Sequence, residues 1–386
     1  MEHKSNGLII VILLSLIGGS MLNLPAQQNT VSTFAKGLKI LNYEGNTFEP
    51  YAYGFANNWT RAGNTVDNFT TYDFSNLIKD GYNVLMLPRT MGLNQTDIDN
   101  IATWYATGKK QLWLGGDSDY AGLFQADDTM NPLLATIGSA LRVSSISIED
   151  PVSNDMAAYR VIANETGVPS NLTDFVTEQF QRMVFHGPTV IHYAINGIAH
   201  DLRNATLGTG ALSGVDIVIN SSKYALPMDS DLSLGSSAFY TYSKITGHYP
   251  MLVTDQINGS MIIVAGEAVW TDYKYMYATF DENGADPHQG SMIVDRLINY
   301  YFLNVLNGSY SETSSSETSM TKSNITKNTS SSASLTDTTT ASKPEMSSSN
   351  SLDTPSIKLP GFGINIAVIA LVPILVIQQR SKNKTD

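Results

Sequence analysis

The sequence predicts an α/β domain with a mostly parallel sheet, helices on both faces and a β-rich insertion. Short apolar runs alternate with segments of helical spacing from about Gly37 to Gly308, and the connections between them are short. That order is typical of strands joined by helices that pack on the faces of a parallel sheet. A third observation is that the chain changes composition after this domain, where we expect a disordered Ser/Thr stalk and a C-terminal transmembrane helix.

The first half of the domain supplies three strands and two helices. The predicted strands are Leu38 to Tyr43, Asn83 to Leu87 and Gln111 to Leu114. A short helix is expected from Asp73 to Lys79. A longer helix begins at the capping residue Asn94, because the apolar residues after it keep helical spacing as far as Gly108. The aromatic residues between Tyr43 and Trp59 are assigned to a loop.

The second half contains the insertion, which we place at about 140–240 of a domain that covers 34–308. Further strands are predicted at 141–148, 159–162, 216–219, 251–254 and 261–265. Thr189 to Leu202 has the form of a hairpin around Asn196-Gly197, a pair that favours a type I′ turn. A final amphipathic helix includes Ile293 and Tyr301.

The two ends of the chain predict an exported, membrane-held protein. Residues 1–27 resemble a signal peptide, because a Lys precedes an apolar run from Leu8 to Ile17. An uncleaved amino-terminal anchor is the alternative. Within 359–378, the run from Leu359 to Ile377 would span roughly 28 Å as a helix, enough to cross a bilayer. Basic residues in the tail, 379–386, place that tail in the cytoplasm and the domain outside.

The segment 309–358 predicts a stalk between domain and membrane. Roughly half of these residues are Ser or Thr and large apolar residues are scarce, so the segment cannot bury enough surface to fold. Such composition is typical of O-glycosylated spacers, and an unmodified linker is the alternative. N-glycosylation sequons begin at Asn58, Asn68, Asn94, Asn164, Asn171, Asn204, Asn220, Asn258, Asn307, Asn324 and Asn328.

Composition excludes several functions. The net charge of −12 argues against nucleic acid and against an anionic membrane surface as partners. The sequence has no Cys, which removes disulfides, thiolate nucleophiles and cysteine-based metal sites. A low histidine content without metal-ligand spacing leaves most His residues as structural groups.

Candidate ligand-binding residues follow from the rule that open parallel sheets bind ligands beyond the carboxyl ends of their strands. Acidic and aromatic side chains gather there, a mixture that suits a sugar or peptide. The alternative is a loop cluster that packs on itself. The candidates are Trp59, Asp117, Ser118, Asp119, Tyr120, His186, Glu267 and Trp270.

Three other patterns are weaker. Ser118 is the nearest substitute for a nucleophile, but flanking carboxylates would oppose an alkoxide. Calcium is a candidate ligand of Asp117 with Asp119, and of a run containing Asp281, Asn283 and Asp286. Neither run matches a complete calcium loop, so a solvated acidic turn is the favoured interpretation of both. The stretch 208–214 imitates a dinucleotide fingerprint with one residue too many, and we interpret it as a flexible loop.

The carboxyl end carries a resemblance. Pro360, Gly361 and Phe362 precede the apolar run and the basic tail, and this order resembles the PGF-CTERM sorting signal of archaeal surface proteins. The resemblance implies a partner, an archaeosortase, that removes the tail and joins the new end to a lipid. Pro373 inside the span and scattered basic residues depart from the pattern.

The domain resembles the class I glutamine amidotransferase-like fold, in its non-catalytic extracytoplasmic branch. The likeness is carried in order by the segments 81–87, 93–97, 108–116, 131–138, 185–189 and 259–267. It implies a flavodoxin-like sheet whose catalytic members hold a Cys nucleophile near the position of Gly115. Because Cys is absent, the resemblance implies no amidotransferase chemistry here.

We therefore expect a glycosylated, non-enzymatic binding or scaffold protein anchored at the cell surface. An accessory domain of an ABC-type transporter is an alternative that the resemblance implies. A hydrolase using Asp117, Asp119 and Glu267 is the alternative from the enzyme class. No cofactor is expected apart from the calcium considered above.

Overall fold

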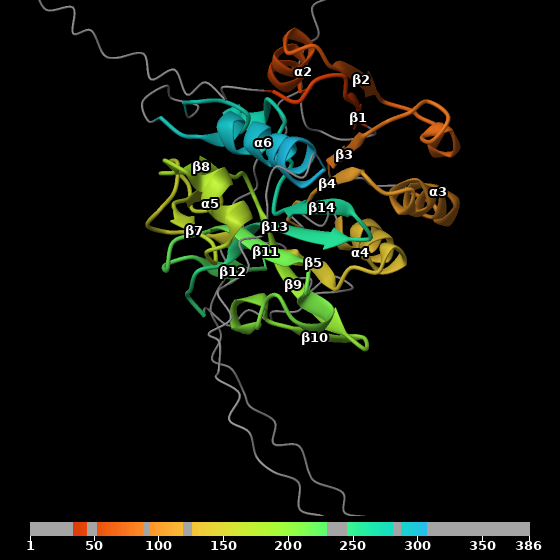
Figure 1. Cartoon of the computed structure of the whole chain (residues 1–386). Coiled ribbons are helices and arrows are strands. Elements are labelled where there is room, and N and C mark those ends of the chain that lie inside the picture. Colours follow the sequence, from red (N-terminus) through yellow and green to blue (C-terminus); the bar gives the residue numbers. More distant parts are fainter. Residues whose placement is uncertain are drawn as a thin grey trace, which may run out of the picture. The chain divides into compact units, whose positions relative to one another are not determined.

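The computed structural model describes residues 34–44, 52–88, 93–118, 126–229, 245–280 and 287–306, which form a mixed α/β domain (Figure 1). The predicted signal peptide, stalk, transmembrane segment and tail lie outside the described residues. Within the described ranges, no helix is long and apolar enough to cross a membrane.

The main sheet has eight strands in the order β2-β1-β3-β4-β14-β13-β11-β7. The first five run parallel to one another: β2 (Thr65–Phe69), β1 (Lys39–Tyr43), β3 (Val84–Pro88), β4 (Gln111–Gly115) and β14 (Ser260–Ala265). The remaining three pair antiparallel: β13 (Pro250–Ile257), β11 (Val215–Asn220) and β7 (Glu165–Thr166). The predicted parallel sheet is thus extended by an antiparallel part.

Side chains of the central strands alternate between two hydrophobic clusters, one on each face. Ile40 and Trp113 belong to the cluster on the first face, and their neighbours Leu41 and Leu114 belong to the cluster on the second face. The first face is covered by α2 (Tyr53–Arg61), α5 (Asn171–Thr177) and α6 (Gly290–Asn299), and the second by η1 (Phe74–Asn76), α3 (Gln95–Ala106) and α4 (Ala126–Ile137). Burial on both faces explains why these strands are apolar throughout.

Local sequence signals identify several of these elements correctly. Asn94 and Asp97 form the capping box that begins α3, each side chain accepting the other's backbone N–H. Two elements before η1 were missed: α2 contains Trp59, which was assigned to a loop, and β2 follows it directly. The helix predicted at 73–79 is only the short 3-10 turn η1, followed by further turns.

A second, antiparallel sheet occupies part of the predicted insertion. Its order is β10-β9-β5-β12, with β10 (Ile198–His200), β9 (Thr189–Ile195), β5 (Leu141–Glu149) and β12 (Leu226–Met228). The predicted turn is present, because Asn196 and Gly197 both have positive φ, 52° and 78°. A small pair, β6 (Ile162–Ala163) with β8 (Met183–Val184), lies apart from both sheets. The stretch 140–240 also supplies β7 and β11 to the main sheet.

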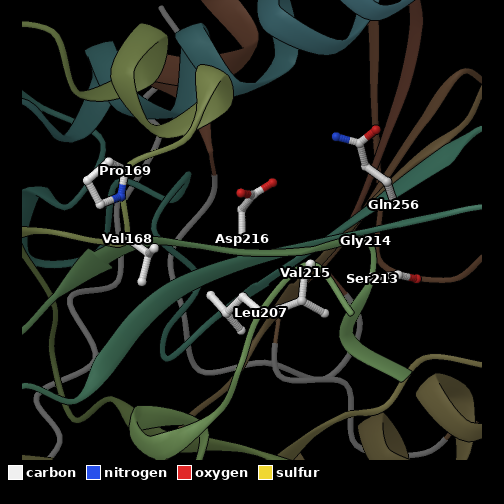
Figure 2. A pocket seen from close by; sticks show the side chains of 9 residues that line it. Val168, Pro169, Leu207, Ser213, Gly214, Val215, Asp216 and Gln256 are labelled. Carbon is white, nitrogen blue, oxygen red and sulfur yellow. The ribbon is translucent and has the colours of Figure 1, made fainter. Parts of the chain in front are cut away.

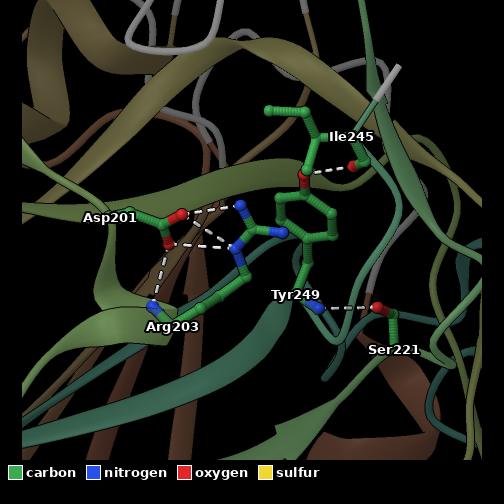
Figure 3. Close-up of polar contacts among 5 residues, drawn as sticks. All are labelled: Asp201, Arg203, Ser221, Ile245 and Tyr249. Atoms are coloured by element: carbon green, nitrogen blue, oxygen red, sulfur yellow. Dashed lines mark hydrogen bonds and ion pairs between the residues drawn. The ribbon is translucent and has the colours of Figure 1, made fainter. Parts of the chain in front are cut away.

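A polar cluster joins the segment around residues 201–203 to Tyr249, the residue before β13 (Figure 3). In the short helix η3 (Leu202–Asn204), Arg203 Nε and Nη2 donate to Asp201 Oδ2 at 3.0 and 2.6 Å. The same guanidinium lies 4.1 Å from the ring centre of Tyr249, whose hydroxyl donates to the Ile245 carbonyl at 2.7 Å. Burial raises the pKa of Tyr249 to about 12. The planar guanidinium donates through two nitrogens to the carboxylate while it lies over the ring, a geometry that suits arginine better than the single ammonium of lysine.

A buried carboxylate joins α2 to α6 across the first face. Asp295 Oδ1 accepts hydrogen bonds from Trp59 Nε1 at 2.7 Å and from the Tyr277 hydroxyl at 2.8 Å. Burial raises the pKa of Asp295 to about 7, against an ordinary value of 3.8, and the two hydrogen bonds oppose that shift in part. A titratable group therefore joins α6 to α2.

Candidate functional site: the carboxyl edge of the parallel sheet

The carboxyl ends of the parallel strands meet at one edge, as predicted. Gly115 pairs in register with Pro88 of β3 and with Ala265 of β14, so β3, β4 and β14 end side by side. The residues that follow β4 and β14 are Gly116 to Ser118 and Gly266 to Glu267. This is the edge where an open α/β sheet would hold a ligand.

Glycines close this edge by bringing backbones into contact. A Cβ on Gly115 would lie 2.6 Å from Ala268 Cα, and one on Gly116 would lie 2.3 Å from Thr189 Cγ2. A Cβ on Gly266 would lie 2.9 Å from Pro188 Cβ. Pro188 and Thr189, at the beginning of β9, therefore pack directly on the residues that follow β4 and β14. No side chain larger than hydrogen fits at these three glycine positions.

We predict that Gly116→Ala destabilises the domain by about 1–3 kcal/mol, because the added methyl overpacks this contact. Urea unfolding of the full chain measures the loss. The double variant Gly116→Ala/Thr189→Ser removes the nearest methyl and keeps the Thr189 hydroxyl function, so it should recover part of the stability. A Gly116→Ala variant with the same urea midpoint as the wild type would contradict the close contact between Gly116 and Thr189.

Three predicted residues come together where β4 ends. The Ser118 N–H donates to the Gly187 carbonyl at 2.9 Å, which places His186 next to this turn. A Cβ on Gly187 would lie 3.3 Å from Ser118 Oγ and 3.5 Å from Asp117 Oδ1. Asp117 and Ser118 are nevertheless buried, with only 8% and 3% of their surfaces exposed. A nucleophilic Ser118 would have to be uncovered before it met a substrate.

The other three described candidates are also covered. Trp59 and Trp270 are fully buried, and Glu267 is 1% exposed. Trp270 packs edge-on against Trp113, with ring centres 5.8 Å apart, and Glu267 Oε1 accepts the N–H of Ala268 at 3.1 Å. The two tryptophans predicted to bind a ligand therefore belong to the hydrophobic core of the first face.

The polar partner of Trp270 was missed by sequence reasoning. Trp270 Nε1 donates to Asn42 Oδ1 at 3.0 Å, and Asn42 Nδ2 donates to Asn68 Oδ1 at 3.2 Å and to Glu44 Oε1 at 3.5 Å. Burial raises the pKa of Glu44. These groups lie where β1 and β2 end, and they hydrogen-bond to one another within the protein.

Aromatic rings remain accessible on the outer side of this edge. The His186 ring lies edge-on between Tyr159 and Tyr273, with ring centres 5.3 and 4.8 Å away. We call these three residues the Tyr–His patch. Tyr159 is 45% exposed, while His186 and Tyr273 are half-buried. The sequence indicates His186 and, among the aromatic residues that follow the last strand, Tyr273. Tyr159 was missed, because it comes from a distant segment that shares no pattern with them.

The backbone beside the Tyr–His patch is strained. Tyr273 begins the short helix η5 (Tyr273–Tyr275), where Lys274 and Tyr275 both adopt positive φ, 47° and 61°. Left-handed backbone is uncommon for side chains of this size, and it concentrates at ligand clamps and switch regions. Asp272, just before η5, accepts the Gly54 N–H with both carboxylate oxygens at 3.1 Å. The loop is thus held in place against the start of α2.

The remaining predicted sites are placed as follows. Asp119, Tyr120, Asp281, Asn283 and Asp286 lie outside the described residues, as do Asn307, Asn324, Asn328, Pro360, Gly361 and Phe362. Across the described part of the chain, no group of three or more acidic or histidine side chains could hold a metal ion. The sequon asparagines Asn58, Asn68, Asn94, Asn164, Asn171, Asn204 and Asn258 are exposed, and Asn220 is half-buried.

Comparison with known proteins gives no family. No family model matches the chain, and no curated protein matches it either. Solved structures that match this chain include the mmIFT52 N-terminal domain, with a TM-score of 0.45, 10% identity, and coverage of 68% of this chain and 96% of that one. A putative ThuA-like protein from Parabacteroides merdae has a TM-score of 0.36, 10% identity and coverage of 69% and 91%.

A third structure is the exo-β-1,4-mannosidase Op5Man5 from Opitutaceae bacterium strain TAV5, with a TM-score of 0.31 and 9% identity. It covers 69% of this chain, which spans only 36% of that protein. Because these scores are low, we infer function from the chain's own residues.

Proposed function

We propose that this chain is a surface-held, non-enzymatic binding protein that recognises neutral saccharides at the Tyr–His patch. One observation carries the proposal: Trp270, a predicted ligand-binding residue, is fully buried, while Tyr159 in the Tyr–His patch is 45% exposed. Exposed tyrosine rings offer flat apolar faces to a sugar, and their hydroxyls offer hydrogen bonds. A net charge of −12 makes an anionic saccharide the less favoured ligand.

The fold supports the amidotransferase-like part of the proposal. The parallel strand order β2-β1-β3-β4-β14 is the flavodoxin-like order. In that arrangement Gly115 ends β4, at the position where the resemblance implies a catalytic Cys. We therefore propose a domain of this type whose catalytic crevice has been replaced by core packing.

We predict that His186→Ala and Tyr159→Ala each weaken saccharide binding by about 5-fold or more, because each removes a ring from the patch. A panel of neutral glycans is first screened against the full chain in detergent, and the glycan bound best is titrated by calorimetry. The control Ile78→Ala removes an exposed apolar side chain from the connection that leads back to the amino end of β3. Equal affinities in all four proteins would contradict the proposal.

The same samples separate binding from catalysis. Each bound glycan is recovered and analysed for hydrolysis or transfer products. We expect the glycan to be unchanged after prolonged incubation. Turnover that is lost in Glu267→Gln would instead support a hydrolase and would contradict the proposal of a non-enzymatic binding protein.

We propose export and anchoring from the sequence alone. The apolar run at 359–377 and the basic tail support membrane attachment, and the sequons support glycosylation outside the cell. Deleting residues 359–386 is expected to release the protein from membranes into the medium of an archaeal expression host. Release without deletion would contradict anchoring.

A further inference from the structure

A cavity of about 480 Å³ lies at the outer border of the main sheet, where β11 begins (Figure 2). Its apolar wall consists of Val168, Pro169, Leu207 and Val215. β7 pairs with β11 at Ile219 and Asn220, and the N–H groups of Gly167 and Val168 extend this contact by donating to the Val218 and Ile217 carbonyls at 2.9 and 3.1 Å. Val215 and Asp216 lie beyond these hydrogen bonds, at the beginning of β11. The cavity shares no residue with the Tyr–His patch.

The glycine-containing loop that imitates a dinucleotide fingerprint forms part of this cavity. Gly208 and Gly214 line it, and the Gly208 N–H donates to the Leu212 carbonyl at 2.9 Å. A Cβ on Gly214 would lie 2.3 Å from the Gln256 carbonyl oxygen, so only glycine lets the loop close against β13. The loop contains the short 3-10 helix η4 (Gly210–Leu212) and opens no longer helix. The loop therefore forms part of the cavity wall, and it lacks the long helix whose N-terminus would bind a phosphate.

The cavity carries one charge. Asp216 extends into it between Pro169 and Gln256 (Figure 2). Burial raises the pKa of Asp216, and the Ser170 side chain opposes that shift by hydrogen bonding. No Lys, Arg or His stands among the described residues that line the cavity. A carboxylate in partly apolar surroundings gains most from a cationic partner, whereas an anion would be repelled.

We propose that this cavity binds a protonated primary amine at the end of a short aliphatic chain. The ammonium group would pair with the Asp216 carboxylate and the Gln256 side-chain oxygen, and the methylene groups would pack on Pro169, which lies on the same side of β11 as Asp216 (Figure 2). The volume accommodates a lysine side chain or a small diamine. The site goes beyond the proposed saccharide function and does not depend on it.

Calorimetry with the full chain tests the site with two probes, 1,5-diaminopentane and a peptide containing one lysine. Binding of the diamine alone would assign the cavity to free amines, and binding of both would assign it to lysine side chains as well. Asp216→Asn is expected to weaken binding at least about ten-fold, since one charge-assisted hydrogen bond is lost. Gln256→Ala should weaken it several-fold.

The matched control is Asp174→Asn, which changes the net charge equally at an exposed position of α5. It should leave binding unchanged. Equal losses in Asp216→Asn and Asp174→Asn would show general electrostatic attraction and overturn the proposal. So would equal affinity for the Nε-acetylated lysine peptide, or absence of binding by both probes to a protein whose circular dichroism shows it folded.

Discussion

Replacing Asp295 with Asn is expected to abolish a loss of stability that the natural protein undergoes between about pH 4 and pH 7. In the folded protein the pKa of Asp295 is raised to about 7, and in the unfolded chain it returns to about 3.8. Between these values the folded protein holds a proton that the unfolded chain has released, so stability falls as pH rises. The contribution is fully present below about pH 4 and amounts to roughly 4 kcal/mol across the window.

Urea unfolding of the full chain at several pH values measures this effect. Asn mimics the protonated carboxyl, so the two proteins should be similarly stable near pH 4, and the variant should become the more stable one towards pH 8. His192 acts in the opposite sense, because burial and the neighbouring Arg142 lower its pKa to about 4. It is present in both proteins, and their difference isolates Asp295.

Asp99→Asn, at an exposed position of α3, controls for removal of a charge. Its pH curve should run parallel to that of the natural protein. Parallel curves for Asp295→Asn as well would show that the carboxyl is not buried between α2 and α6.

Trp270→Ala is expected to cost about 3–5 kcal/mol, because it leaves a cavity beside Trp113 in the core and leaves Asn42 Oδ1 without its donor. Trp270→Phe keeps most of the volume and loses only the hydrogen bond, so about 1–2 kcal/mol is expected. Thermal and urea unfolding measure both. Tyr53→Ala removes a side chain that is 58% exposed and should change stability little. An Ala variant as stable as the natural protein would mean that Trp270 lines an open site.

The elements that sequence predicts best are those whose signals are local. Asn94 and Asp97 lie in one turn of α3, and Asn196-Gly197 sets its own hairpin geometry. The missed helix α2 lacks such a signal: Ala52 at its N-cap makes no side-chain hydrogen bond, and the carboxylate of Asp272 caps it from far along the chain. Because β2 is an edge strand with mostly exposed residues, no apolar run marks it.

The candidate site likewise has parts that local sequence signals predict and parts that depend on distant contacts. The strand ends could be located from sequence, and with them Asp117, Ser118 and Glu267. Their burial could not, because it depends on β9 crossing over Gly116 and Gly266. Trp59 packs against Phe34, which precedes β1, with ring centres 5.0 Å apart, so it does not lie where β1 ends. Whether a tryptophan faces solvent or core depends on a partner such as Asn42 or Asp295. Tyr159 and Tyr273 become neighbours only through His186 in the folded chain.

Tryptophan fluorescence tests the filled crevice most directly. The sequence has 4 tryptophans, and Trp59, Trp104, Trp113 and Trp270 are all fully buried. We therefore predict blue-shifted emission that acrylamide quenches weakly, with little change on adding a saccharide. Trp270→Phe identifies the share of the signal from the crevice. Efficient quenching of an emission that disappears in Trp270→Phe would show an open crevice, and would contradict the account of this edge as closed.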